Sequence, residues 1–182
     1  MKDLRDFIAK CEAEGQLHRI KAEVDWNLEL SHIAKLNEEK KGPALLFENV
    51  KGYDWPIVTS TCTTTERLAI IMGMPKETPL VELMRHWVKI GSRKIPPKLL
   101  ETGPCKENKM MGDEVDLFKF PVPKFFPLDG GRYFGTAHCV ITKDPEADWV
   151  NIGTYRLQLI EKNILGNSRS TKKRFSVARP IG

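Results

Sequence analysis

The chain has 182 residues, 41% of them hydrophobic and 29% charged, which is typical of a globular protein and not of a disordered one. The formal net charge of +5 is modest and spread along the chain, so it favours a solvated surface of mixed sign over a nucleic-acid interface. No apolar run approaches the ~18 residues of a membrane span, and no secretory signal precedes the first amphipathic segment. The length is sufficient for one domain, or one and a half, with a buried core.

The cysteines are far apart in the sequence and lack the spacing of a zinc site. They are Cys11, Cys62, Cys105 and Cys139. Scattered cysteines of this kind are typical of reduced thiols, so we expect a cytoplasmic protein.

The first part of the chain alternates between helical and strand patterns. Apolar residues at helical spacing predict an amphipathic helix over residues 3–14, with Asp3 as its cap and Gly15 at its end. A second helix is predicted over residues 27–40. Strands are predicted over residues 17–24, 44–48 and 57–60.

Two more helices follow. Thr63 and Glu66 have the spacing of a capping box and open a helix that ends at Gly73. Thr78-Pro79 begins the next helix. Its apolar stripe is predicted to be buried, and consists of Leu80, Leu83, Met84, Trp87 and Val88. The strand–helix alternation predicts an α/β domain over residues 1–108.

Beyond residue 91 the composition changes. Residues 91–112 are rich in glycine and proline, as in a linker, and we place the domain boundary near residues 105–112. The prolines of residues 118–127 favour an extended chain. Tyr133–Thr142 and Val150–Glu161 then predict a long hairpin, which cannot stand alone in water and needs further strands that the chain does not supply.

The second strand of this hairpin contains polar residues that a plain sheet does not need. Arg156 presents a planar fork of donors suited to a phosphate or carboxylate, and the carbonyl of Asn151 is a hard ligand for a cation. Their odd separation points them to opposite faces of a regular strand. If both serve one ligand, the chain bulges near Gly153 or the ligand wraps the strand end.

Five ordered motifs between residues 3 and 166 resemble the UbiD-type decarboxylases. They are Asp3-Leu-Arg-Asp-Phe7, Pro43-Ala-Leu-Leu-Phe-Glu-Asn-Val-Lys-Gly-Tyr53, Asp129-Gly-Gly-Arg-Tyr133, Ile141-Thr-Lys-Asp-Pro145 and Asn151-Ile-Gly-Thr-Tyr-Arg156. The resemblance implies a non-oxidative decarboxylase of an aromatic or α,β-unsaturated acid, such as a hydroxybenzoate. It also implies prenylated FMN, a divalent metal (usually Mn²⁺), often K⁺, and an oligomer.

The same resemblance implies site residues and a fold. Asn151 would bind the metal that holds the cofactor phosphate, and Thr154, Tyr155 and Arg156 would line the cofactor. Arg156 would also lie near the substrate carboxylate as the catalytic residue. An N-terminal α/β domain (residues 1–108) would precede the first strands of a split β-barrel of the flavin-reductase type (residues 109–166), an α/β (α+β) arrangement that this chain leaves incomplete.

After residue 166 the sequence departs from the family and ends in a basic segment, residues 167–182. This segment is either an unrelated tail or a rearranged downstream piece of the family sequence. Further metal ligands and the acidic proton donor of the family are absent before this point, so we expect little activity from the chain alone. The alternative is a non-catalytic subunit that completes its barrel with a partner chain, since an open sheet edge invites pairing.

Overall fold

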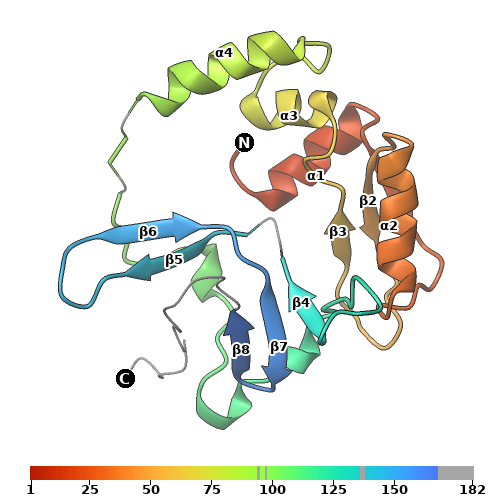
Figure 1. Ribbon diagram of the computed structural model, residues 1–182, viewed down its shortest axis with the longest axis vertical. Helices are drawn as coiled ribbons and strands as arrows, with labels where there is room; N and C mark the ends of the chain where they lie inside the picture. Colours follow the sequence, from red (N-terminus) through yellow and green to blue (C-terminus); the bar gives the residue numbers. More distant parts are fainter. Residues whose placement is uncertain (94, 97, 136–137, 168–182) are drawn as a thin grey trace. The chain divides into compact units, whose positions relative to one another are not determined.

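The computed structural model describes residues 1–93, 95–96, 98–135 and 138–167, so most of the predicted tail lies outside the described residues. The chain forms two compact units (Figure 1). The first unit comprises Met1–Val24 and His32–Lys109. The second comprises Asp25–Ser31 and the chain from Met110 onward.

The first unit contains a three-stranded sheet with the order β1-β2-β3. The strands are β1 (Leu17–Ile20), β2 (Ala44–Phe47) and β3 (Ile57–Thr59). β1 and β2 are parallel, with Leu17 opposite Ala44, whereas β2 and β3 are antiparallel. All four residues of the central strand β2 are buried, as expected for a short apolar run with a neighbour on each side.

The helices begin close to the positions predicted from sequence. They are α1 (Leu4–Ala13), α2 (Glu29–Glu39), α3 (Thr65–Met72) and α4 (Leu80–Gly91). The Asp3 carboxylate accepts the Asp6 N–H and caps α1, and α2 is the crossover that connects the parallel strands β1 and β2. Within the part of the chain that the structure describes, no helix has the length and apolar character needed to cross a membrane.

The core of the first unit forms around Phe7, Cys11 and Ile70, where α1 packs on α3. Arg67 is also fully buried, and its guanidinium donates to the Gly42 carbonyl and to the Thr63 hydroxyl. Because burial disfavours a charge, the pKa of Arg67 is lowered; burial likewise raises the pKa of the Cys11 thiol.

The apolar stripe of α4 is exposed, contrary to the sequence prediction. Only Leu83 is buried; Trp87 and Val88 are 56% and 68% exposed, and Leu80 and Met84 are exposed as well. Helical spacing predicted the stripe correctly, but the described residues place no cover over most of it. The prediction for residues 17–24 was also too long, since β1 ends at Ile20.

The second unit contains two small antiparallel sheets (Figure 1). One has the order β4-β7-β8, with β4 (Arg132–Phe134), β7 (Leu157–Glu161) and β8 (Ile164–Asn167). The other pairs β5 (Val140–Lys143) with β6 (Val150–Gly153). Three short 3-10 turns precede them, at Pro104–Lys106, Gly112–Glu114 and Leu117–Lys119.

These sheets correct two sequence predictions. Val150–Glu161 is not one continuous strand, because β6 and β7 pair with different partners. The hairpin also has a further strand from this chain, since β8 pairs with β7.

The segment Asp25–Ser31 packs against the extended chain of the second unit. The Arg132 guanidinium lies 4.0 Å from the centroid of the Trp26 ring and donates to the Val122 carbonyl. The Ser31 hydroxyl donates to the Phe125 carbonyl at 2.8 Å. The proline-rich run is thereby held as an extended layer beside β4.

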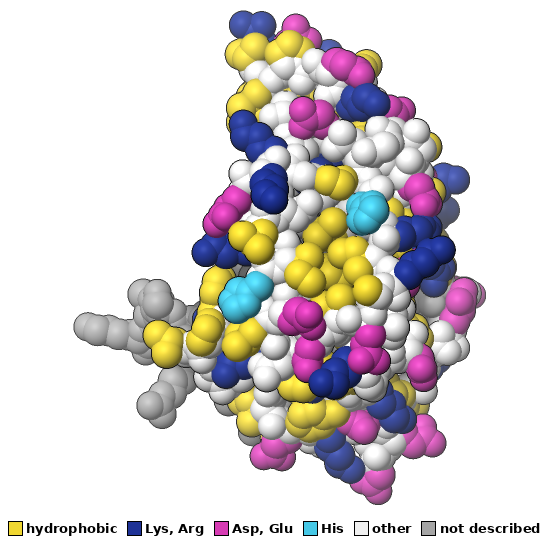
Figure 2. Space-filling view, turned by 90° about the vertical axis from the view of Figure 1, so that its right-hand side faces the viewer, with side chains coloured by type: hydrophobic (Ala, Val, Ile, Leu, Met, Phe, Trp, Pro, Cys, Tyr) yellow, Lys and Arg dark blue, Asp and Glu magenta, His cyan; other side chains and the backbone are white. Residues whose placement is uncertain are grey.

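Charged side chains of both signs are interspersed over the face shown in Figure 2. This pattern is typical of a solvated surface, and the described charges on that face form no single-sign region of the kind that binds a polyanion.

Candidate functional site

The predicted site residues lie where the second unit's chain passes from one small sheet to the other. β6 ends at Gly153 and β7 begins at Leu157, so residues 154–156 connect them. On the facing strand, β4 ends at Phe134 and β5 begins at Val140. Phe134 pairs with Leu157 and Val140 pairs with Gly153. The two antiparallel segments therefore leave their strands between the same two residue pairs. We call this interruption the ribbon break.

Arg156 is fixed in the ribbon break by two residues of the Asp129–Tyr133 motif. Its Nη1 donates to Asp129 Oδ1 at 2.9 Å, and its guanidinium carbon lies 4.1 Å from the centroid of the Tyr133 ring. The Arg156 side chain is nevertheless 46% exposed, whereas that of Asp129 is 8% exposed. Asp129 therefore holds one edge of the guanidinium and the Tyr133 ring covers one of its faces, while the rest is exposed to solvent.

The sequence analysis assigned no role to Asp129, although it belongs to a quoted motif. Its second carboxylate oxygen accepts the backbone N–H of Phe126 at 3.2 Å. A buried carboxylate that joins a backbone amide to a guanidinium orients both groups. The signal in the sequence was an acid just before two glycines and Tyr133, but only the fold shows which cation it meets.

Asn151 lies on β6 opposite Thr142, on the half-buried face of the ribbon. Its Nδ2 is buried and has no hydrogen-bond partner among the described residues. Amide nitrogen and oxygen exchange places by rotating the side chain, so this buried end can equally present its carbonyl. Because an unpaired buried polar group costs about 1–3 kcal/mol, a ligand or water that pairs with this end of Asn151 would stabilise the fold.

The chain keeps its alternation of exposure through the ribbon break. Asn151, Gly153 and Tyr155 are partly buried, whereas the intervening residues and Arg156 are exposed. Asn151 and Arg156 therefore stand on opposite sides of this alternation, as their odd separation predicted. The described residues do not bring the two side chains to one cavity.

Gly153 accommodates the side chain of Tyr155. A Cβ at position 153 would lie 2.7 Å from the Tyr155 hydroxyl oxygen and 2.8 Å from its ring carbon Cζ. The absence of a side chain at Gly153 thus makes room for the ring of a residue two positions along the chain. Thr154, the remaining predicted cofactor residue, is exposed.

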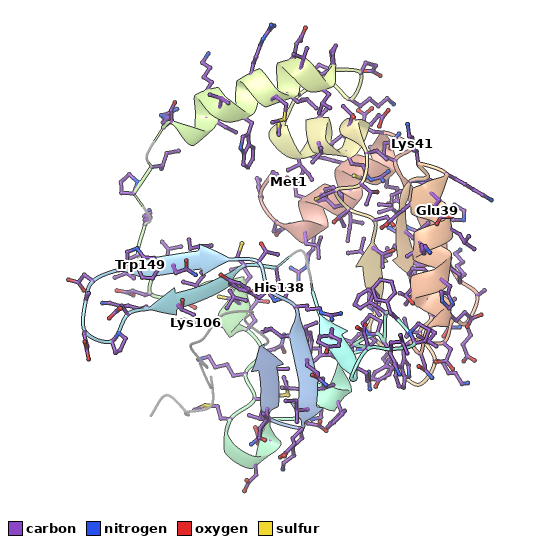
Figure 3. All side chains as sticks on the ribbon, in the orientation of Figure 1. Met1, Glu39, Lys41, Lys106, His138 and Trp149 are labelled. Carbon is purple, nitrogen blue, oxygen red and sulfur yellow. The ribbon has the colours of Figure 1, made fainter. Side chains whose placement is uncertain are left out.

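His138 is a polar residue of the ribbon break that the sequence analysis did not identify. Its Nε2 is buried without a partner among the described residues, and its ring packs on Gly135, which has φ +107°. Figure 3 labels His138 beside the connection between β4 and β5.

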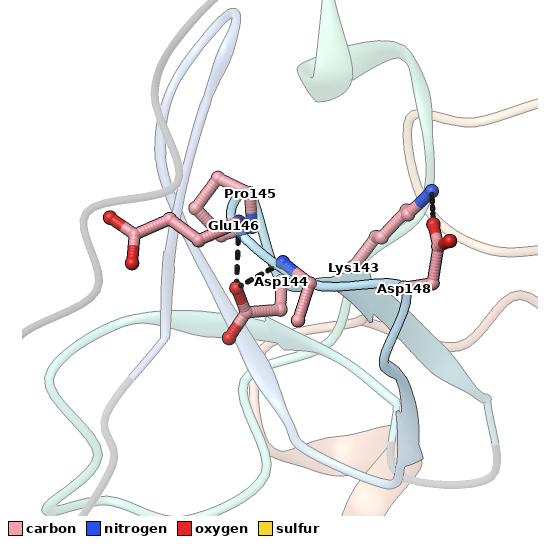
Figure 4. A pocket seen from close by; sticks show the side chains of 6 residues that line it. Lys143, Asp144, Pro145, Glu146 and Asp148 are labelled. Carbon is pink, nitrogen blue, oxygen red and sulfur yellow. Dashed lines mark hydrogen bonds and ion pairs between the residues drawn. The ribbon is translucent and has the colours of Figure 1, made fainter.

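A shallow hollow at the β5–β6 turn is a poor candidate for a site (Figure 4). Asp144 accepts the backbone N–H groups of Glu146 and Ala147, and Lys143 pairs with Asp148 at 2.9 Å. The turn thus satisfies its own polar groups. Glu146 and Asp148 lie on this turn and are not placed to donate a proton in the ribbon break.

A metal would find few ligands in the part of the chain described here. No group of three or more His, Cys, Asp or Glu side chains there could hold an ion. Asn151 fits the role of one oxygen ligand, because its buried amide end is unpaired. A hard cation takes about six oxygens, so the others would come from elsewhere. The roles assigned to Asn151, Thr154, Tyr155 and Arg156 stay predictions.

Two family models match the chain. The model of the 3-octaprenyl-4-hydroxybenzoate carboxy-lyase N-terminal domain matches residues 8–87, and the model of the Rift-related domain of the same enzymes matches residues 98–178. The second match extends past residue 166, where the sequence analysis placed the departure from the family.

Solved structures of similar proteins agree with these matches. Vanillic acid decarboxylase from Sedimentibacter hydroxybenzoicus, in open form with a truncated ShVdcD, is 31% identical with a TM-score of 0.85 over 92% of this chain and 37% of that chain. An evolved dimeric form of the UbiD-class enzyme HmfF from Pelotomaculum thermopropionicum, in complex with prFMN, is 30% identical with a TM-score of 0.81. That match covers 93% of this chain and 38% of HmfF.

A third structure shows the fold alone. The apo 3,4-dihydroxybenzoic acid decarboxylase from Enterobacter cloacae is 24% identical with a TM-score of 0.80, over 95% of this chain and 38% of that chain. The chain therefore spans somewhat more than a third of the length of these relatives.

Proposed function

Because this chain belongs to the UbiD family, with its N-terminal and Rift-related domains, we propose that it forms the first part of a non-oxidative decarboxylase. The substrate class is an aromatic or α,β-unsaturated carboxylic acid such as a hydroxybenzoate, and the cofactor is prenylated FMN. The observation that carries this proposal is the guanidinium of Arg156, which Asp129 holds and which is still half-exposed, in a chain similar to an enzyme solved with prFMN. Asn151, on the other face of the ribbon, has a buried Nδ2 without a partner among the described residues.

Arg156 is proposed to hold the carboxylate of the acid. Asp129 accepts from Nη1, and within the described part of the chain no further acceptor is recorded for the other N–H donors of the guanidinium, which can therefore meet a ligand. A planar fork of donors suits a carboxylate, and Tyr133 beneath it limits the directions the fork can take. Arg156 therefore orients the bond that breaks, and it stabilises the acid before carbon dioxide leaves.

Asn151 is proposed to ligate a divalent cation, with Mn²⁺ as the candidate and K⁺ as a possible companion. That cation would hold the cofactor phosphate, while Thr154 and Tyr155 line the cofactor. When bound, prenylated FMN supplies an electron sink for decarboxylation. The protein's own contribution is to position the Asn151-bound cation and the Arg156 guanidinium around the cofactor.

The two small sheets are proposed to be the first strands of a split β-barrel of the flavin-reductase type. Their support is the two-stranded β5–β6 ribbon, which has too few strands to be stable alone. The relatives have well over twice the length of this chain, which is ample for the remaining strands and for an acidic proton donor. The unpaired cysteines favour a reducing, cytoplasmic setting.

A second candidate is a non-catalytic subunit that completes its barrel with another chain. The observation that favours it is that the similar vanillic acid decarboxylase is an assembly of named C and D parts. An open strand edge in this chain would serve such pairing.

Complementation distinguishes these possibilities. The chain alone, supplied with prenylated FMN and Mn²⁺, should release no carbon dioxide from 4-hydroxybenzoate. Addition of a polypeptide that carries the remaining two-thirds of HmfF should restore release, and Arg156→Met should abolish the restored activity.

Arg85→Met is the matched control, because Arg85 is exposed on α4 and should leave the restored activity unchanged. Turnover by the chain alone would contradict its incompleteness. A stable complex without turnover would contradict the decarboxylase proposal and favour the non-catalytic subunit.

A further inference from the structure

Gln158 of β7 is bonded to the same tyrosine whose ring lies against the Arg156 guanidinium. It pairs with Tyr133 in the register of β4 with β7, where facing side chains share one side of the sheet. The Tyr133 hydroxyl donates to Gln158 Oε1 at 3.3 Å, and both side chains are half-buried. Gln158 has no role in the proposed function.

The two glycines that precede Tyr133 by two and three positions make room for the Gln158 amide. A Cβ at Gly131 would lie 3.0 Å from Gln158 Nε2, and a Cβ at Gly130 would lie 3.4 Å from the same atom. A methyl group at Gly131 would therefore crowd the amide and displace the end of this flexible side chain. The Asp129–Tyr133 motif thus supplies a carboxylate to Arg156, space to Gln158 and a ring that contacts both.

The hydroxyl bond restricts the ring, and the ring restricts the guanidinium. Gln158 Oε1 fixes the far end of Tyr133, which otherwise turns more freely about its side-chain bonds. Asp129 bonds Nη1 of Arg156, and a single bond at one nitrogen leaves the guanidinium free to rotate about it. The Tyr133 ring, 4.1 Å from the guanidinium carbon, is therefore the contact that fixes the plane of the group.

We propose that Gln158 is a positioning residue for Arg156, which acts through Tyr133. By accepting the Tyr133 hydroxyl it keeps the ring beneath the guanidinium, and the ring sets the plane in which the remaining N–H donors point. A carboxylate is bound by two parallel hydrogen bonds only in that plane. The inference rests on the proposed function for the ligand, an aromatic or unsaturated acid, and makes Gln158 a determinant of how the carboxylate of that acid is oriented.

Chemical modification of individual arginines tests this arrangement in the full chain. Phenylglyoxal modifies accessible guanidinium groups, and mass spectrometry of proteolytic peptides gives a rate for each arginine. Gln158→Leu should raise the rate at Arg156 by about fivefold, the factor that corresponds to one neutral hydrogen bond of about 1 kcal/mol. Arg132, which donates to the Val122 carbonyl in the same unit, should keep its rate.

Matched variants separate the hydrogen bond from the fold. Tyr133→Phe removes the hydroxyl and keeps the ring, so it should raise the Arg156 rate as Gln158→Leu does, with no further rise when the two are combined. Gln158→Glu keeps the acceptor oxygen and should retain the slow rate. Gly131→Ala crowds the amide and should behave as Gln158→Leu does. Glu161→Gln changes an exposed residue of β7 and should change nothing.

Three results would overturn the inference. The first is an unchanged rate at Arg156 in Gln158→Leu. The second is a parallel rise at Arg132 and Arg156, because it would show a loosened unit and not a displaced side chain. The third is additive rises for Gln158→Leu and Tyr133→Phe, because the two groups would then act separately.

The proposed function has its own readout in the same experiment. 4-Hydroxybenzoate should slow the modification of Arg156 in the unsubstituted chain, because its carboxylate would occupy the free N–H donors. Absence of this protection would count against the role of Arg156 in binding the acid. It would leave the positioning of Arg156 by Gln158 intact, since that is measured without the acid.

Discussion

The Arg156 side chain is fixed by neighbouring residues and still has a solvent-exposed part that could bind a ligand. A surface ion pair contributes little to stability, but here the carboxylate is almost buried and also accepts a backbone amide. Tyr133 adds a ring beneath the guanidinium. Asp129 and Tyr133 belong to one of the quoted motifs and Arg156 ends another. Two motifs that are separate in the sequence are therefore in contact in the structure.

Replacement of Asp129 by Asn should loosen this arrangement. We expect the free energy of unfolding to fall by about 0.5–1.5 kcal/mol, since a mostly buried charge-assisted bond is lost while Arg156 stays partly solvated. Urea unfolding of Asp129→Asn, Arg156→Met and the double variant measures the coupling between the two side chains. Asp148→Asn is the control, because its carboxylate is fully exposed, and it should show no measurable change. Independent, additive losses for Asp129 and Arg156 would show that the ion pair contributes nothing in solution.

Arg67 is a different kind of buried residue. Its Nη1 and Nη2 donate to neutral oxygens of Gly42, Gln16 and Thr63, which ties three segments of the first unit together. The sequence pattern of α3 gave no sign of it, because an arginine in the first turn of a helix is normally solvated.

Among the elements, the ribbon break is the feature that the sequence concealed. Exposure alternates from Asn151 to Arg156 without a gap, so the pattern fits one continuous strand. At the change of partner lie the positive φ of Gly135 and the Tyr155 ring over Gly153, and neither is visible in an alternation of polar and apolar residues. β8 was missed for a related reason, since a four-residue strand that contains Gly166 has too little pattern.

For helix α4, the sequence predicted the secondary structure correctly but not the burial of its apolar residues. Its apolar spacing predicted an amphipathic helix correctly, because helical periodicity depends only on the chain itself. Whether the stripe is buried depends on a covering surface, and periodicity contains no information on that surface. The same reasoning explains why Asn151 and Arg156 were identified by residue type, whereas Asp129 and His138 required the fold.

The burial within α4 predicts unequal costs of truncation. Leu83→Ala removes a fully buried side chain and should lower the free energy of unfolding by about 2–5 kcal/mol. Val88→Ala removes an exposed one from the same helix and should change it by less than about 0.5 kcal/mol. Urea unfolding measures both. An equal loss in the two variants would mean that the apolar stripe is covered in solution.

At the scale of the whole chain, each unit holds its elements together in its own way. In the second unit the aromatic and proline-rich layer is held by Arg132 on Trp26. In the first, Arg19 of β1 reaches Glu12 of α1 and Glu48 after β2, so one guanidinium joins a helix to two strands. The α/β part of the fold was anticipated from the alternation of strand and helix patterns. These contacts could not be, because Arg19 with Glu48 and Arg132 with Trp26 join segments that are far apart in the sequence.

The Arg19 contacts also predict how stability depends on pH. The hydrogen bond from Arg19 lowers the pKa of Glu12, and Lys10 similarly lowers the pKa of Asp6. A carboxyl group with a lowered folded-state pKa contributes stability above its unfolded pKa and loses that contribution as the pH falls through the folded value. An unperturbed glutamate has a pKa of about 4.5, so the first unit should lose stability as the pH falls below about 4.5.

Glu12→Gln isolates the part of this loss that belongs to Glu12. The variant cannot titrate at this position, so its urea midpoint should fall less between pH 5 and pH 3, in steps of about half a pH unit, than that of the unsubstituted chain. Glu39→Gln removes an exposed glutamate from α2 and should follow the unsubstituted chain throughout. Because Glu48 shares the same guanidinium, Glu12→Gln combined with Glu48→Gln tests whether Arg19 acts as one bridge. If the combined variant loses no more of the pH dependence than Glu12→Gln alone, the acid sensitivity arises at the α1 contact, and the strand contact only orients Arg19.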